Sequence, residues 1–206
     1  NYNLMKVDLT ESVAPNRSLS VVFKVYEDGI GFRYEIPEQK DREEWIIENE
    51  NTEFQLTNDP MTWWIPGDWD IYEHLYNTTR FSAINALSKR NHPNLASTKI
   101  PFNAVNTPVT MKTDEGLYLS FHEADLTDYP GMTLLVDTIN LKMKSGLVGS
   151  DITGYKAKIT LPFNTPWRTI QVGKTAGELI ESNLMVNLND PSVVADVSWF
   201  KPMKYV

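Results

Sequence analysis

The chain has 206 residues, no cysteine and a formal net charge of -8. This length suits one large β domain, so we predict a single domain over residues 1–206. The excess of 27 acidic over 19 basic residues argues against nucleic acid as a partner, and no apolar run is long enough for a membrane span. The lack of cysteine excludes disulfides, cysteine-ligated zinc and thiol nucleophiles.

Two β-hairpins are predicted along the chain. The first joins residues 19–26 to 30–36 through Asp28-Gly29, because glycine tolerates the positive φ of such turns. The second joins residues 107–112 to 117–125 through Asp114-Glu115-Gly116. Further short strands are predicted at 2–10, 44–47, 53–57, 62–65, 132–137, 139–144, 155–161, 167–172 and 183–188. This regular spacing favours a mainly β, antiparallel sandwich or barrel.

Helical signals are few. Residues 79–87 are predicted to form a short helix, and residues 176–182 a second one with Thr175 as its N-cap. Residues 59–70 and 88–100 are rich in proline, glycine or asparagine and are predicted to be loops.

The first of these loops carries Trp63, Trp64 and Trp69. Aromatic faces in a loop can stack on the C–H surfaces of sugars, whereas core packing is the simpler role for at least one of the three. The sequence therefore keeps open a free-standing carbohydrate-binding module that uses this cluster as a platform.

The most polar strand end is the segment 119–129. In an extended strand Glu123 and Asp125 point to one face, and His122 and Ala124 to the other. A carboxylate that follows an apolar run needs a partner if it is buried, and a hard cation such as Ca²⁺ would serve. A solvated strand end is the alternative, and composition alone favours it by about two to one.

Other chemistry has weaker support. Glu73 and Glu123 could be cast as the carboxylate pair of a glycosidase, but nothing in their spacing supports it. Arg168 follows a tryptophan and could approach a ligand or simply pack on aromatic neighbours. Nucleotide-binding and nucleophile-elbow motifs are missing, and the histidines, His74, His92 and His122, lack the spacing of a zinc protease.

Six segments in order resemble one known family. They are FKVYEDGIGFRYE (23–35), YEHLYN (72–77), NTPVTMKTDEGLYLSFHEA (106–124), TPWRTIQ (165–171), ESNL (181–184) and SWFKP (198–202). Each is short, but together they are similar to the N-terminal domain of glycoside hydrolase family 97 over nearly the whole chain.

The resemblance implies an antiparallel β-super-sandwich, similar to galactose-mutarotase-like domains, beside a (β/α)₈ barrel. Family members hydrolyse α-glucosidic or α-galactosidic bonds and depend on Ca²⁺, and their catalytic acid and base or nucleophile lie on the barrel, so no catalytic residue is expected in this chain. The family's N-terminal domain lends the calcium site a glutamate that matches Glu123, which reverses the preference for a solvated strand end. Glu73, Asn106 and Arg168 become candidates for substrate contacts.

The sequence also departs from the family. Further strands precede Tyr2 in family members, and the barrel follows the position of Val206, so this chain is expected to be most of one domain. The residues Thr78–Phe81 replace a usual acidic residue and proline, and Met203 stands where glycine is common. A periplasmic or secreted location is implied, although no signal peptide is present. An aldose 1-epimerase on the same architecture would need a histidine beside a carboxylate, and His122 lies on the strand face opposite to Glu123.

Overall fold

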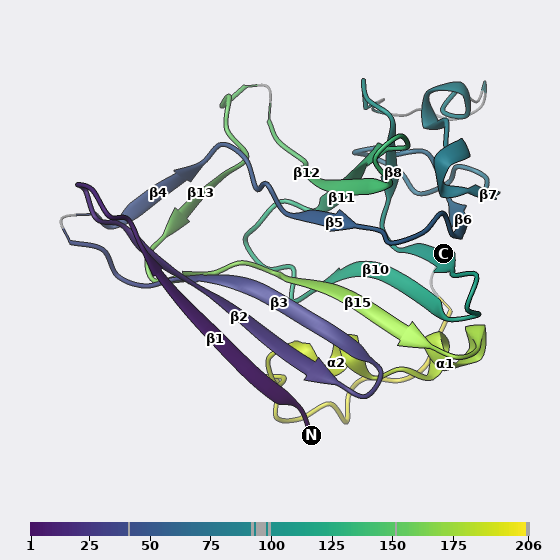
Figure 1. Cartoon of the computed structure of the whole chain (residues 1–206). Helices are drawn as coiled ribbons and strands as arrows, with labels where there is room; N and C mark the ends of the chain where they lie inside the picture. Colours follow the sequence, from purple (N-terminus) through teal and green to yellow (C-terminus); the bar gives the residue numbers. More distant parts are fainter. Residues whose placement is uncertain (41, 92, 94–97, 99, 151, 205–206) are drawn as a thin grey trace.

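The computed structural model describes residues 1–40, 42–91, 93, 98, 100–150 and 152–204. They form three antiparallel sheets (Figure 1). The largest has nine strands, in the order β1-β2-β3-β15-β10-β9-β6-β7 with β14 paired to β3, and a four-stranded sheet, β5-β12-β11-β8, lies over one of its faces. A two-stranded sheet, β13-β4, extends this second layer. The predicted mainly β, antiparallel super-sandwich is confirmed.

The elements have the following bounds. The largest sheet contains β1 (Asn3–Thr10), β2 (Ser18–Tyr26), β3 (Gly29–Ile36), β6 (Met61–Trp64), β7 (Asn77–Arg80), β9 (Val109–Lys112), β10 (Tyr118–Ala124), β14 (Phe163–Asn164) and β15 (Trp167–Gly173). The smaller sheets contain β4 (Glu44–Ile47), β5 (Glu53–Gln55), β8 (Ala104–Asn106), β11 (Met132–Asp137), β12 (Lys142–Leu147) and β13 (Ala157–Thr160). The helices are α1 (Ala176–Glu181), α2 (Leu184–Leu188) and the 3₁₀ turns η1 (Phe81–Ala83) and η2 (Ala86–Ser88). None of the helices in the described residues is long and apolar enough to cross a membrane.

The main core lies between the two larger sheets. Alternate residues of the facing strands point into it, as the strand period of two requires. Its buried members include Phe54, Trp64, Phe81, Val105, Met111, Phe121, Met132, Leu134 and Met143. The rings of Phe54 and Phe121, one from each layer, meet edge to face at 5.3 Å between centroids. Such contacts fix the second layer over the first.

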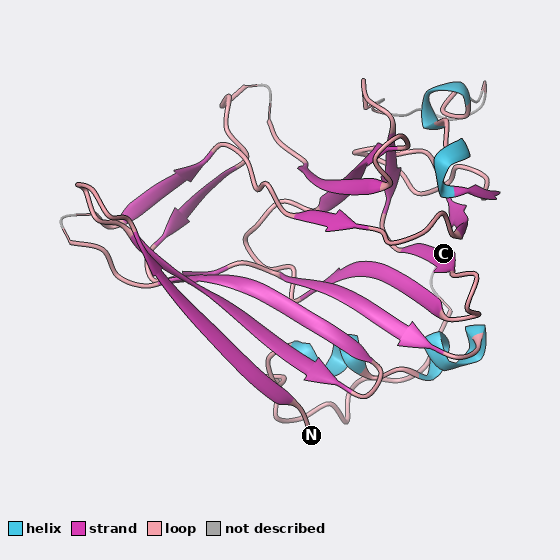
Figure 2. Ribbon diagram, viewed as in Figure 1, coloured by secondary structure: helices cyan, strands magenta, loops and turns pink. Residues whose placement is uncertain are grey.

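The helices α1 and α2 cover the opposite face of the largest sheet (Figure 2). Leu184 and Leu188 of α2 are buried there with Trp167. Gly31 gives them room, because a Cβ at this position would lie 2.5 Å from Leu188 Cδ1. The α1 helix begins at Thr175, whose side chain accepts a hydrogen bond from the Glu178 N–H, as the cap prediction required.

Both predicted hairpins are confirmed. In the first, Tyr26 of β2 pairs with Gly29 of β3, so the turn consists of Glu27 and Asp28 rather than Asp28-Gly29. The Gly29 φ of +151° suits glycine. A Cβ at Gly29 would lie 2.3 Å from the carbonyl oxygen of Ile170, so the neighbouring strand also requires glycine. In the second, Gly116 has a φ of +92° in the turn between β9 and β10.

Two predicted elements are wrong. The strand expected at 183–188 is the helix α2, whose Leu184 and Leu188 lie one turn apart and are buried together with Trp167. The helix expected at 79–87 is instead the edge strand β7 followed by η1 and η2, since Thr79 pairs with Thr62 and accepts a hydrogen bond from Trp64 Nε1.

Strand boundaries shift at several places. The strand expected at 139–144 begins only at Lys142, because Asp137 accepts hydrogen bonds from the Ile139 and Asn140 N–H groups and forms a turn there. The strand β10 ends at Ala124, and Asp125 has a φ of +56°, so Asp125 does not continue the Glu123 face. The strands β7, β8 and β14 were not predicted. Part of the loop expected at 88–100, with His92, lies outside the described residues.

Candidate functional site

A charged cluster lies between the two layers, centred on Arg168. This residue faces Glu123 across the paired strands β15 and β10, and its side chain is 0% exposed. Burial favours the neutral guanidinium, but hydrogen bonds and charge from Glu50 and Glu123 outweigh it and raise the pKa of Arg168 above its usual value. The ring of Tyr129 lies 5.9 Å from Arg168 Cζ.

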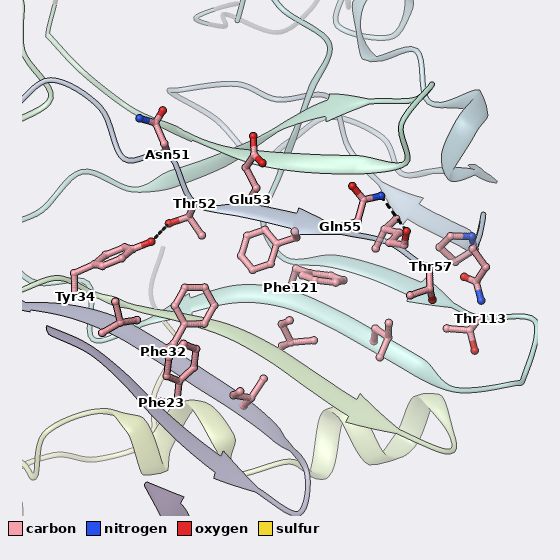
Figure 3. A pocket seen from close by; sticks show the side chains of 18 residues that line it. Phe23, Phe32, Tyr34, Asn51, Thr52, Glu53, Gln55, Thr57, Thr113 and Phe121 are labelled. Atoms are coloured by element: carbon pink, nitrogen blue, oxygen red, sulfur yellow. Dashed lines mark hydrogen bonds between the residues drawn. The ribbon is translucent and has the colours of Figure 1, made fainter. Parts of the chain in front are cut away.

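Glu50 holds one edge of this guanidinium. Arg168 Nε donates to Glu50 Oε1 at 2.8 Å, and Nη2 donates to Oε2 at 2.7 Å. Thr52 Oγ1 also donates to Glu50 Oε1 at 2.8 Å, and lies 2.8 Å from the Tyr34 hydroxyl (Figure 3). Glu50 is 5% exposed at its side chain, so the pair is a buried, fully hydrogen-bonded ion pair that joins the segment before β5 to the largest sheet.

Glu123 accepts a hydrogen bond from the third guanidinium nitrogen of Arg168. Arg168 Nη1 donates to Glu123 Oε2 at 2.6 Å, and the Met132 N–H donates to Oε1 at 3.0 Å and to Oε2 at 3.2 Å. Burial raises the pKa of Glu123 above its usual value, against the charge of Arg168 and the Met132 N–H. Glu123 is therefore a buried, partnered carboxylate, and the solvated strand end is excluded.

The donor set around Glu123 suits one ligand of a metal site. A carboxylate oxygen offers two lone pairs, so Oε1 keeps an acceptor position beside the Met132 N–H. No group of three or more histidine, cysteine or acidic side chains that could hold a metal occurs in the described part of the chain. Because Ca²⁺ takes about six to eight oxygen ligands, these residues could only complete a site whose other ligands come from elsewhere.

The other predicted site residues form no hydrogen bond or ion pair with this cluster among the described residues. Glu73 is exposed and has no hydrogen bond or ion pair with the described residues. Asn106 is fully buried in β8, where Oδ1 accepts from the Asp68 N–H at 3.0 Å and Nδ2 donates to the Ile71 carbonyl at 3.2 Å. Its amide thus fixes the loop that leads to Glu73.

The same loop contains a buried pair that the sequence did not reveal. His74 Nε2 lies 3.1 Å from Asp68 Oδ2, and both side chains are almost wholly buried. Burial raises the pKa of Asp68, but the N–H donors of Asp70, Ile71 and Thr98 together with His74 outweigh it and hold the pKa below its usual value. The pair stabilises the loop from within.

The three loop tryptophans do not form one platform. Trp64 is 1% exposed and belongs to the main core. Trp63 points to the other face of the same strand and stacks on Tyr118 at 6.3 Å between centroids. Trp69 lies near Lys156, whose Nζ is 5.8 Å from its ring centroid. The predicted core role is confirmed for Trp64, and no stacking surface unites the three.

His122 does not join the carboxylates. Its strand neighbour Ala124 packs with α2, on the face away from Glu123. Burial lowers the pKa of His122, and Nδ1 has no hydrogen-bond partner among the described residues. His122 therefore does not form the histidine and carboxylate pairing of an epimerase with Glu123.

A groove of about 650 Å³ opens between the layers beside the cluster (Figure 3). Its lining is mostly apolar, with Phe23, Phe32 and Phe121 from the largest sheet and Phe54 from β5, and Tyr34 and Thr52 stand at the end toward Glu50. Among the described residues that line it, Glu53 is the single carboxylate and pairs with Lys142, so the lining offers no carboxylate pair for acid and base catalysis.

One residue of the cluster, Glu50, was not predicted from the sequence. Glu50 lies in a polar segment without periodicity, and its partner Arg168 is 118 residues further on. The Trp167-Arg168 pair was a partial signal in the sequence, because an arginine that is buried requires acidic partners. No local pattern identifies which glutamates are those partners.

Comparison with known proteins fits these features. The model of the family described as glycosyl-hydrolase 97 N-terminal matches residues 1–191. A retaining alpha-galactosidase of Bacteroides thetaiotaomicron is 24% identical over 214 residues, which cover 90% of this chain and 30% of the relative.

Solved structures give the same answer. A glycoside hydrolase family 97 enzyme from Pseudoalteromonas sp. strain K8, solved with acarbose and with panose among other forms, is 35% identical and superposes with TM-scores of 0.81 and 0.83 in these complexes. The match covers 98% of this chain and 28% of that enzyme. A beta-arabinopyranosidase, 17% identical with a TM-score of 0.63 over 84% of this chain and 31% of its own, shares the fold. The chain thus spans about 30% of the length of the relatives it matches, and it belongs to the glycosyl-hydrolase 97 N-terminal family.

Proposed function

We propose that residues 1–206 are the non-catalytic N-terminal domain of a glycoside hydrolase that cleaves α-glucosidic or α-galactosidic bonds, and that they form one wall of its active-site cleft. The relatives named above support this substrate class. The observation that carries the non-catalytic role is the state of Glu50 and Glu123. Both carboxylates are buried and held by Arg168, so neither is free to protonate a leaving group or activate water.

Hydrolysis of aryl α-glucosides and aryl α-galactosides tests this proposal. We expect no turnover by the purified 206-residue chain, and turnover of one class of substrate by the full natural polypeptide that carries it. Robust turnover by the chain alone would refute the view that catalysis depends on a (β/α)₈ barrel outside these residues.

We further propose that Glu123 is one calcium ligand of the intact enzyme. The free acceptor position on Oε1 supports this role, and the single carboxylate oxygen explains why other ligands are needed. The chain alone should bind Ca²⁺ weakly or not at all. In the full natural polypeptide Glu123→Gln should weaken calcium affinity and activity together, whereas unchanged calcium dependence would contradict the assignment.

The candidate substrate contacts divide by exposure. We propose that Glu73 contacts the substrate. Glu73 is exposed, and its neighbour Tyr72 lies close to Glu123: the pKa of Tyr72 is raised mainly by burial and, to a smaller extent, by the negative charge of Glu123. Asn106 and Arg168 are fully buried and act through the residues they hold. Glu73→Gln should raise KM for the α-glycoside with little change in kcat, and an unchanged KM would remove Glu73 from the site.

The family resemblance also supports a periplasmic or secreted protein. Fractionation of cells that express the full natural polypeptide tests this, and recovery in the cytoplasm would contradict it.

A further inference from the structure

Glu50 has no part in the proposed function so far, yet it controls how Arg168 meets Glu123. Its two oxygens bind Nε and Nη2, which form one edge of the guanidinium, at 2.8 and 2.7 Å. With that edge taken, Nη1 is the nitrogen that reaches Glu123.

The contact with Glu123 is therefore made through one nitrogen. Nη1 donates to Oε2 at 2.6 Å, and Oε1 accepts only from the Met132 N–H at 3.0 Å among the described residues. An arginine that faces a carboxylate frequently pairs with both oxygens through two parallel hydrogen bonds. Nη2 has a second N–H that could serve Glu123, so it is the orientation of the guanidinium that decides the contact. By holding Nε and Nη2, Glu50 fixes an orientation in which only Nη1 donates to Glu123, and an acceptor position stays open on Oε1.

Glu50 also sets the charge of the cluster. Glu50, Glu123 and Arg168 together carry a formal charge of about -1, whereas Glu123 and Arg168 alone would be neutral and would present a guanidinium to any incoming cation. The three side chains are 5%, 7% and 0% exposed, so water screens these charges little. Both effects, geometry and charge, favour a cation at Glu123 only when Glu50 is present.

We propose that Glu50 is a positioning residue that acts through Arg168 to keep Glu123 Oε1 available to a divalent cation. The inference rests on the proposed calcium role of Glu123. Glu50 itself does not touch the cation.

Calcium titration of the full natural polypeptide by isothermal calorimetry tests the proposal. Glu50→Gln keeps the shape of the side chain and can accept from Nε, but its amide repels Nη2 and releases it toward Glu123. We expect calcium affinity to fall about tenfold to a hundredfold, as for other residues that orient a metal ligand. The matched control is Glu53→Gln, an exposed carboxylate on β5 that pairs with Lys142 and should leave the affinity unchanged. Wild-type affinity in Glu50→Gln would overturn the proposal.

A second measurement separates position from charge and does not depend on calcium. In a crystal structure of calcium-free Glu50→Gln, Arg168 should be turned so that Nη1 and Nη2 contact both oxygens of Glu123. Retention of the single Nη1 contact would also overturn the proposal.

Calcium titration of the Glu123→Gln variant in parallel separates failure of the proposed calcium role of Glu123 from failure of the proposed role of Glu50. If Glu123→Gln binds calcium as the wild type does, the calcium role of Glu123 fails. If Glu123→Gln binds weakly and Glu50→Gln binds normally, the inference about Glu50 fails alone.

Discussion

Replacing Arg168 with methionine is the most informative test of the buried cluster. The arginine makes three hydrogen bonds of 2.6 to 2.8 Å to Glu50 and Glu123, and its side chain is 0% exposed. Arg168→Met leaves both carboxylates buried without a counter-charge. Breaking a buried ion pair in this way typically costs about 3–5 kcal/mol, a large part of the roughly 5–15 kcal/mol that stabilises a domain.

Urea unfolding of the 206-residue chain, followed by tryptophan fluorescence, measures this loss. With a slope of about 2.5 kcal/mol/M, a loss of about 4 kcal/mol lowers the midpoint by about 1.6 M. Adding Glu50→Gln and Glu123→Gln to Arg168→Met removes the unpaired charges and should recover at least half of the lost free energy. A loss below about 1 kcal/mol in Arg168→Met would refute the view that three buried charges are paired here.

Three further outcomes follow from the packing and the loop pair. Leu188→Ala should lower the free energy of unfolding in urea by about 2–5 kcal/mol, because Leu188 is 2% exposed against the sheet; a loss below about 1 kcal/mol would show that α2 is not packed there. Gly31→Ala should destabilise the wild type by a clash with Leu188, and clearly less in the Leu188→Ala background, whereas equal losses would exclude this contact. The lowered pKa of Asp68 means that its contribution to stability is present above the unfolded pKa of about 3.9 and is lost as pH falls through the lower folded pKa. Asp68→Asn should therefore be less stable than the wild type at neutral pH, with a difference that narrows below about pH 4; a difference independent of pH would contradict this.

Local chemistry predicted much of the fold. The two hairpins and the cap at Thr175 depend on residues adjacent in sequence, and all three formed, with the first turn one residue earlier than expected because Gly29 already belongs to β3. The helix α2 was mistaken for a strand because Leu184 and Leu188 lie in a short apolar run. A spacing of four residues fits one face of a strand as well as one face of a helix. The helix is favoured only once the glycines of β3 provide a surface on which both leucines can pack.

The cluster was only half predictable. Strand alternation correctly separated Glu123 from His122, and the cost of a buried carboxylate correctly required a partner for Glu123. The partner, Arg168, lies 45 residues away and meets Glu123 because β10 and β15 are neighbours, a pairing that no local pattern reveals. Glu50 is further removed, since it reaches Arg168 from the segment before β5, in the other layer.

A crystal structure of the full natural polypeptide with bound calcium tests the central claim most directly. We expect a cation about 2.3–2.6 Å from Glu123 Oε1, with Arg168 still held by both oxygens of Glu50 and with the remaining ligands outside residues 1–206. A cation bound away from Glu123, or an Arg168 that covers both Glu123 oxygens in the calcium-bound enzyme, would contradict it.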